Sequence, residues 1–176
     1  TAIIIISSIF WLIKNVISNN NKSFFIISKN NFPFQFFIFL IFIQIIIGAF
    51  VSGLDAGKIY QTWPLMGNSF IPNDLNLVDL KKISGFDNHS LVQFYHRNIA
   101  YIIFLYALFL SIFIFKKKIL KLYNSLKVLL LFLFLQIMLG IFTLVSDLHI
   151  LLASMHQIIS VLLVFSAINL YYLRAK

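Results

Sequence analysis

Five long apolar runs separated by polar segments set the pattern of this chain and predict five membrane helices. They cover residues 2–17, 34–51, 91–115, 128–145 and 150–173. A run such as 91–115, at about 1.5 Å rise per residue, is long enough to cross a bilayer core of about 30 Å. We expect the first run, which Lys14 interrupts, to continue from sequence upstream of Thr1. Pro33 suits the first turn of the second helix, where a missing N–H costs nothing.

The polar segments predict two loops of different kinds. Residues 15–31 form a loop in which 24–27 dips into the membrane interface. Residues 53–90 carry repeated Gly and Pro and form a long extramembrane loop. Within it, residues 73–83 predict a short surface helix capped by Asn73. We therefore divide the chain into residues 1–32, a partial upstream helix with its loop, and residues 33–176, a four-helix half with the long outer loop 53–90.

Composition places the protein in a membrane and fixes its orientation. Apolar residues make up 61% of the chain and charged residues 11%, which is far from the balance of soluble domains. Ten of the fourteen cations flank one side of the predicted spans, whereas all five aspartates lie on the other. The positive-inside rule puts the lysine-rich side in the cytoplasm or matrix and loop 53–90 outside. The net charge of +9 is thereby explained by topology, and we expect no nucleic-acid partner.

Two histidines inside apolar runs are the candidate functional residues. His96 lies in the run 91–115, whose only charged residue is Arg97, and His156 lies in the run 150–173. Ionisable groups at such depth are costly and mark functional sites. Each histidine is about six residues from the outer end of its helix, or roughly 9 Å at helical rise. The two imidazoles are therefore expected at the same level.

An internal repeat gives a second reason to pair these histidines. Residues 44–50 (QIIIGAF) resemble residues 136–142 (QIMLGIF), and each segment is followed by a loop and a histidine-bearing helix. The four-helix half thus looks like two copies of one hairpin, and equivalent positions in such a repeat face each other. Gly48 and Gly140 would let a backbone or a flat macrocycle approach closely.

Facing imidazoles at one level can take both axial positions of a haem iron, so we predict that His96 and His156 bind a haem, with Arg97 pairing a propionate. Simpler readings stay open. In one of them, each histidine has no role beyond a hydrogen bond to a neighbouring helix, and the Arg97 side chain extends to lipid headgroups.

Gln44 and Gln136 are expected to be interhelical hydrogen-bonding residues rather than ligands. We expect His89 and His149 at the interface to be solvated or to cap loops. Because the sequence has no Cys and no Glu, other metal centres are disfavoured.

The motifs together resemble a known family. Residues 48–67 (GAFVSGLDAGKIYQTWPLMG), 71–72 (IP), 92–97 (VQFYHR), 136–144 (QIMLGIFTL) and 156–157 (HQ) are similar to the C-terminal half of haem A synthase of the alphaproteobacterial and mitochondrial type. The resemblance covers roughly residues 34–172, and the GLDAG-to-WPLMG run is its most specific part.

The resemblance implies an eight-helix protein of a bacterial plasma or mitochondrial inner membrane, built as two similar halves. It oxidises a methyl group of haem O to the formyl of haem A for cytochrome c oxidase biogenesis. The pair matching His96 and His156 holds a haem b there, and the other half takes haem O. The resemblance also implies haem O synthase, an unidentified electron donor and membrane lipid as partners. This chain lacks the N-terminal half, so we expect a fragment or a split protein whose catalytic residues lie in the missing part. The loop cysteines of some bacterial members are also absent.

Two other function classes fit the pattern less completely. A b-type cytochrome acting as an electron-transfer or membrane-anchor subunit would bind the same haem without oxygenase activity. A structural or transport bundle would bind none. Neither accounts for the GLDAG-to-WPLMG loop.

Overall fold

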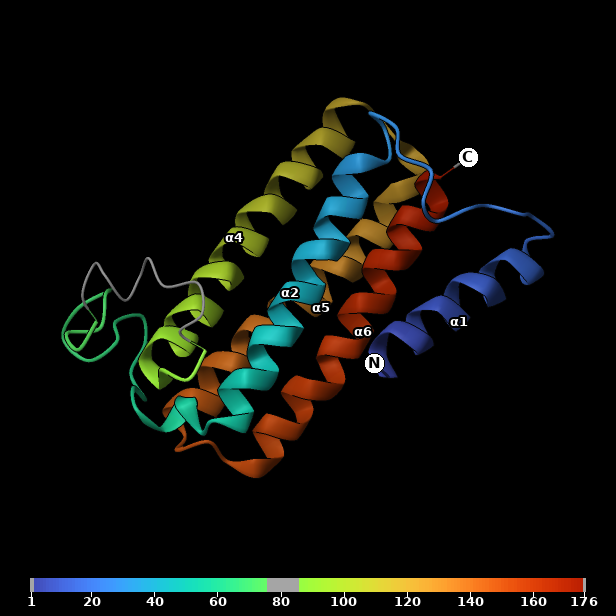
Figure 1. The fold of residues 1–176 in the computed structure, drawn as a ribbon. Coiled ribbons are helices and arrows are strands. Elements are labelled where there is room, and N and C mark those ends of the chain that lie inside the picture. The colour runs from blue at the N-terminus through green and yellow to red at the C-terminus, as the bar shows by residue number, and fades with distance from the viewer. Residues whose placement is uncertain (1, 76–85, 176) are drawn as a thin grey trace.

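The computed structural model describes residues 2–75 and 86–175, and within them every long regular element is a helix (Figure 1). The order is α1 (Ala2–Ile17), α2 (Phe32–Gly53), the 3-10 turn η1 (Ala56–Lys58), α4 (His89–Lys116), the 3-10 turn η2 (Leu120–Leu122), α5 (Tyr123–Val145) and α6 (Ile150–Arg174). Helices α2, α4, α5 and α6 are long and apolar enough to cross a membrane, whereas α1 has 16 residues. The predicted all-α membrane bundle is confirmed, and the chain is an integral membrane protein.

Local sequence explains where the helices begin. Pro33 stands in the first turn of α2, as predicted. Helix α4 begins two residues earlier than expected, because the side-chain oxygen of Asn88 accepts a hydrogen bond from the backbone N–H of Leu91 and caps the helix. Helix α5 begins at Tyr123 rather than at 128, because its first turn buries Ser125 and Leu126. The predicted short helix 73–83 falls mostly outside the described residues.

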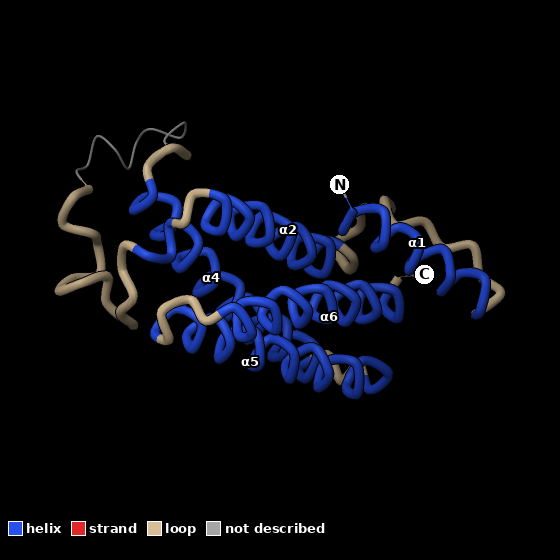
Figure 2. Tube along the Cα trace, turned by 90° about the horizontal axis from the view of Figure 1, so that it is seen from below, coloured by secondary structure: helices blue, strands red, loops and turns tan. Residues whose placement is uncertain are grey.

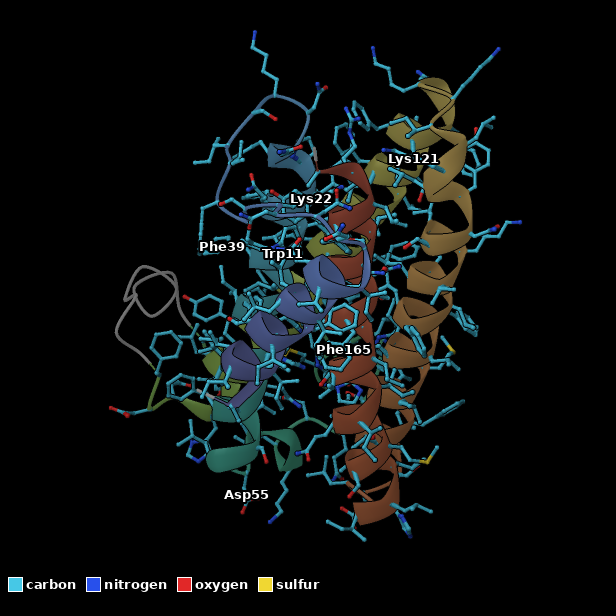
Figure 3. All side chains as sticks on the ribbon, turned by 90° about the vertical axis from the view of Figure 1, so that its right-hand side faces the viewer. Trp11, Lys22, Phe39, Asp55, Lys121 and Phe165 are labelled. Carbon is cyan, nitrogen blue, oxygen red and sulfur yellow. The ribbon has the colours of Figure 1, made fainter. Side chains whose placement is uncertain are left out.

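The four long helices pack as two hairpins. Helix α2 packs against α4 and α5 packs against α6, with further contacts between α2 and α6 and between α4 and α5. Helix α1 contacts α6 and lies at the edge of the four-helix group (Figure 2). The indole ring of Trp11 stacks on Tyr171, and the ring of Phe10 stacks on Phe165 at 4.8 Å (Figure 3).

The two ends of the bundle differ in charge and in packing. Lys121 and Asp55 lie at opposite ends (Figure 3). Toward the lysine-rich end, apolar side chains of all four long helices are fully buried, among them Phe37, Leu110, Leu129 and Ile168. Toward the loop end, by contrast, none of residues 134–162 is buried, and in 94–102 none is buried either. Both histidines lie in this loosely packed half.

Candidate functional site

His96 and His156 occupy nearly equivalent places in their helices. His96 is seven residues after His89, the first residue of α4, and His156 is six residues after Ile150, the first residue of α6. The difference of one residue is about 1.5 Å along a helix. Both side chains are half-buried rather than exposed to the surroundings of the bundle. Both histidines are thus six or seven residues from the loop-side start of their helices, and the shared level of the two rings stays a prediction.

His96 is held by two residues of α2. The amide nitrogen Nε2 of Gln44 lies 3.2 Å from Nδ1 and 3.3 Å from Nε2 of the His96 ring, and it also donates to the His96 backbone carbonyl at 3.0 Å. A Cβ placed on Gly48 would lie 3.1 Å from Cε1 of the ring. Gln44 and Gly48 are four residues apart and therefore share one helix face. The imidazole thus rests on bare backbone with an amide beside it.

His156 meets the same pair of residue types on α5. Nε2 of Gln136 lies 3.2 Å from Nε2 of the His156 ring, and a Cβ on Gly140 would lie 3.0 Å from its Cε1. The internal repeat seen in the sequence is therefore a repeat of side-chain geometry. Gln44 and Gln136 link neighbouring helices, as predicted, and each does so through the histidine of the partner helix.

The surroundings of these rings leave several polar atoms unsatisfied. Buried atoms with no hydrogen-bond partner include Oε1 of Gln44, Oε1 of Gln136 and Nδ1 of His156. Buried polar atoms are rarely left unpaired, and such groups call for a ligand, a water or an ion.

This donor set fits a haem better than a bare metal ion. Within residues 2–75 and 86–175, no three His, Cys, Asp or Glu side chains gather in a group that could hold a metal. A porphyrin brings four nitrogens of its own and asks the protein for only two axial ligands. Two half-buried imidazoles, orphaned polar atoms beside them and a loosely packed bundle half meet that requirement.

Arg97 points into the outer loop. Its Nη1 donates to the backbone carbonyls of Thr62 at 2.8 Å and Leu65 at 3.2 Å, and its Nη2 donates to that of Tyr60 at 2.8 Å. Nε2 of Gln93, one helical turn earlier, also donates to the Tyr60 carbonyl at 2.9 Å. The guanidinium therefore fastens residues 60–65 of the loop to α4. Its Nε is buried without a partner, and pairing with a propionate stays a prediction.

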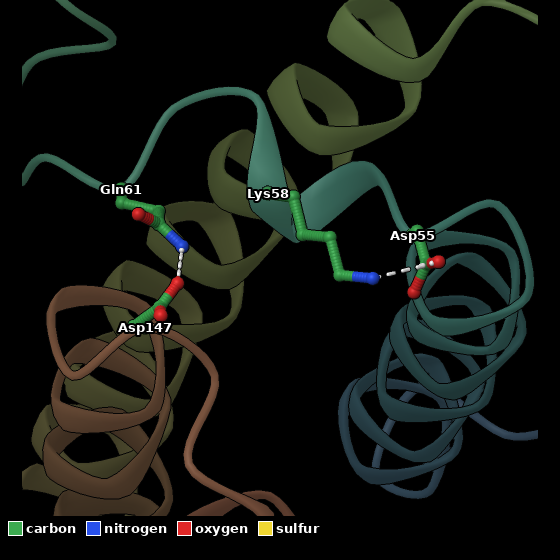
Figure 4. Close-up of polar contacts among 4 residues, drawn as sticks. All are labelled: Asp55, Lys58, Gln61 and Asp147. Carbon is green, nitrogen blue, oxygen red and sulfur yellow. Dashed lines mark hydrogen bonds and ion pairs between the residues drawn. The ribbon is translucent and has the colours of Figure 1, made fainter.

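The same loop reaches the second hairpin. Nε2 of Gln61 donates to Oδ1 of Asp147 in the α5–α6 turn at 2.7 Å (Figure 4). Beside this contact, Leu148 packs against Gly57 in η1. The Lys58–Asp55 ion pair of the same figure is exposed and lies within the loop. The loop thus bridges both hairpins at the end nearest the histidines. No pattern in the sequence predicts this contact.

The remaining histidines stay at the helix starts. His89 is the first residue of α4 and His149 precedes α6; both are exposed. This position agrees with the solvated or capping role that the sequence suggested.

Comparison with known proteins adds a family match. The sequence model of the family described as "Cytochrome oxidase assembly protein" (COX15-CtaA) matches residues 1–168. A protein of Pelagibacter ubique (strain HTCC1062) named "Heme A synthase" is 39% identical over 177 residues, which cover 97% of this chain and 49% of the relative. Proteins of the same name from Wolbachia sp. subsp. Brugia malayi (strain TRS) and Rickettsia africae (strain ESF-5) are 42% and 34% identical, covering 79% and 98% of this chain.

The shared region is only part of these relatives. The chain covers 40% of the Wolbachia protein and 51% of the Rickettsia protein, so it spans about half the length of the curated relatives it matches. No solved structure gives a significant match.

Proposed function

Because the chain belongs to the cytochrome oxidase assembly protein family, we propose that it is the C-terminal half of a haem A synthase, in which His96 and His156 bind one haem b. The observation that carries this proposal is the repeated geometry: each imidazole sits on a glycine and beside a glutamine amide of the partner helix. Two histidines with a purely structural role would not require the same glycine and glutamine surroundings twice.

The chain's own residues prepare both rings as ligands. An amide N–H of Gln44 or Gln136 can only donate to a ring nitrogen, so each imidazole is neutral, which is the form that binds metal. The lone pair that accepts this bond is the one that an iron would take, so a bound haem would replace the amide at that nitrogen. Gly48 and Gly140 set the height of each ring above the helix backbone. The bridging loop, fastened by Arg97 and Gln61, covers the outer end of this region. A bound haem would supply a one-electron redox centre between the hairpins.

The other half of the enzyme would carry the substrate. In the proposed reaction a methyl group of haem O becomes the formyl of haem A, so two carbon–hydrogen bonds are replaced by a carbon–oxygen double bond. With dioxygen as oxidant and source of the oxygen atom, the step consumes two O2, four electrons and four protons and releases three water molecules. The four electrons come from the expected electron donor. Residues 134–162, none of which is buried, offer area for docking the second half. Haem O synthase is the expected source of substrate.

A second candidate is a b-type cytochrome that serves as an electron-transfer or anchor subunit. It is favoured by the single pair of half-buried histidines within the described residues, since one pair suffices to hold one haem.

Haem A content separates the two candidates. The chain is fused to the N-terminal half of the Pelagibacter relative and expressed in a strain that lacks haem A synthase. We expect the fusion to restore haem A, His96→Ala and His156→Ala to abolish it, and the exposed matched control His149→Ala to retain it. A fusion that binds haem b yet yields no haem A would favour the cytochrome instead.

A further inference from the structure

A polar pocket lies at the lysine-rich end of the bundle, far along the helices from the histidines. It has a volume of about 450 Å³ and forms where α4 and α6 end and the α1–α2 loop passes. Its lining residues are Lys29, Asn30, Phe113, Lys117, Ile119 and Arg174. Three separate segments thus bring one cation each to a single pocket.

Within residues 2–75 and 86–175, Lys29, Lys117 and Arg174 form no ion pair with a carboxylate. All five acidic residues of the sequence belong to the 53–90 loop or to the α5–α6 turn. Within the part of the chain that the structure describes, the only ion pair is Lys58–Asp55 at the opposite end. Like charges gathered without an anion repel one another. A ligand with negative charge would relieve that repulsion.

The pocket cations also lack hydrogen-bond acceptors. Lys22, at the same end, donates to the backbone carbonyls of Tyr172 and Ala175 and so caps α6. The side chains of Lys29, Lys117 and Arg174 make no such bond within residues 2–75 and 86–175, and Nε of Arg174 is buried without a partner. Phosphate groups bind well to the planar guanidinium of an arginine and to lysine ammonium groups, and the pocket offers one of the former and two of the latter.

We propose that this pocket binds the phosphate headgroup of an anionic phospholipid. The lipid source is favoured over free phosphate because Phe113 and Ile119 give the pocket an apolar side. Next to them, Phe115 and Leu120 are exposed on the helix surface, where acyl chains would lie. Basic pockets between membrane helices on the positive-inside face are suited to such headgroups. The site is independent of the haem proposal, since it shares no residue with it.

Native mass spectrometry of the detergent-purified chain tests the proposal. Dioleoyl phosphatidylglycerol is titrated against dioleoyl phosphatidylcholine, which has the same acyl chains and no net charge. We expect one tightly retained phosphatidylglycerol per chain. Lys117→Gln and Arg174→Gln should each weaken it about fivefold, and the double variant more than tenfold, as expected for the loss of one or two cations. Lys29→Gln, from another segment, should act in the same direction.

Lys121→Gln is the matched control, because Lys121 is an exposed cation of the same end that does not line the pocket. It should change the affinity by less than about twofold. Equal losses in Lys121→Gln and Lys117→Gln would mean a general charge effect and overturn the proposal, as would equal retention of phosphatidylcholine. Displacement of the lipid by millimolar inorganic phosphate would assign the pocket to free phosphate and also overturn it. All variants elute as the wild type in size exclusion if they fold.

Discussion

The His156 ring lies directly on the backbone of Gly140, so that a Cβ at this glycine would be only 3.0 Å from Cε1 of the imidazole. The same relation joins His96 to Gly48 at 3.1 Å. These distances are tighter than nine in ten contacts of real Cβ atoms, so a side chain at either glycine would force the ring to move by a few tenths of an ångström. Neither glycine has an unusual backbone angle among those recorded, so the residue type is explained by the ring above it.

Adding one methyl group at either glycine should therefore disturb the histidine. Gly48→Ala and Gly140→Ala are expected to push the ring off its position at a cost of about 1–3 kcal/mol, which lowers haem affinity about tenfold or more. Haem titration of the purified variants measures this. Gly53→Ala is the control, because nothing lies within 4 Å of its added Cβ and α2 should keep its stability. If Gly140→Ala binds haem as tightly as Gly53→Ala, then Gly140 does not position the His156 ring for haem binding.

The glutamines should tune the haem without being its ligands. Gln44→Ala and Gln136→Ala remove the amide beside each ring. With haem bound, the unpaired Oε1 of each amide can accept from the free ring N–H, and losing such a partner reduces metal affinity about 10–100-fold. We expect both variants to remain low-spin when saturated with haem but to show a shifted midpoint potential in a spectroelectrochemical titration. Gln157→Ala, an exposed neighbour of His156, should leave the potential unchanged. Loss of the low-spin spectrum in Gln44→Ala would instead point to direct ligation.

The helices and the matching surroundings of the two histidines could be predicted because they depend on local pattern. Apolar length fixed the spans, and the QIIIGAF and QIMLGIF repeat matched Gln44 with Gln136 and Gly48 with Gly140. The start of α5 was missed by five residues, because burial of Leu126 against the other helices extends it through polar Tyr123 and Asn124. That burial is a tertiary effect with no signal in the local sequence.

Arg97 is expected to act as the anchor of the outer loop. Arg97→Ala removes three hydrogen bonds from a charged donor to loop carbonyls, each worth about 1.5–3 kcal/mol before relaxation. Hydrogen exchange of residues 60–67 should speed up at least about tenfold. Arg97→Lys should recover only part of the protection, because an ammonium lacks the planar fork.

Lys58→Ala is the control for the loop anchor. It breaks an exposed ion pair, a contact worth roughly 0–1 kcal/mol, so exchange should hardly change. If Arg97→Ala leaves loop exchange unchanged while haem binding falls, Arg97 serves the haem propionate rather than the loop.

The loop should also respond to pH through Asp74. Its carboxylate accepts hydrogen bonds from the Tyr60 hydroxyl at 2.7 Å and the Ser90 hydroxyl at 2.6 Å. Burial alone would raise the pKa of Asp74, but these two hydrogen bonds outweigh it and hold the pKa below 3.8. The hydrogen bond to Asp74, and then burial, raise the pKa of Tyr60 above 10.0. The stabilisation is therefore present between about pH 4 and 10 and is lost as pH falls through the Asp74 pKa or rises through the Tyr60 pKa.

Trp63 fluorescence reports this transition, because Trp63 is the loop's own tryptophan and Trp11→Phe removes the other one. We expect the signal to change below pH 4 in the wild type. In Asp74→Asn the acid transition should be absent, because an amide does not titrate in this range. An identical acid transition in both proteins would rule out Asp74 as its origin.

The contacts of the outer loop with α4 and with the α5–α6 turn could not be predicted from the sequence, for a physical reason. Arg97 was expected near a propionate because its neighbour is His96, yet its long side chain reaches the carbonyls of Tyr60, Thr62 and Leu65. The Gln61–Asp147 bond joins residues 86 positions apart. Such contacts depend on how the chain folds back over the bundle, which no periodicity in the sequence encodes.

Near-infrared magnetic circular dichroism of the haem-loaded chain tests most directly whether His96 and His156 share one iron, since it identifies axial ligands. We predict one haem per chain with a bis-histidine low-spin signature that disappears in His96→Ala and in His156→Ala and persists in the exposed controls His89→Ala and His149→Ala. A bis-histidine signature that survives loss of His96 or His156 would contradict the shared-iron site.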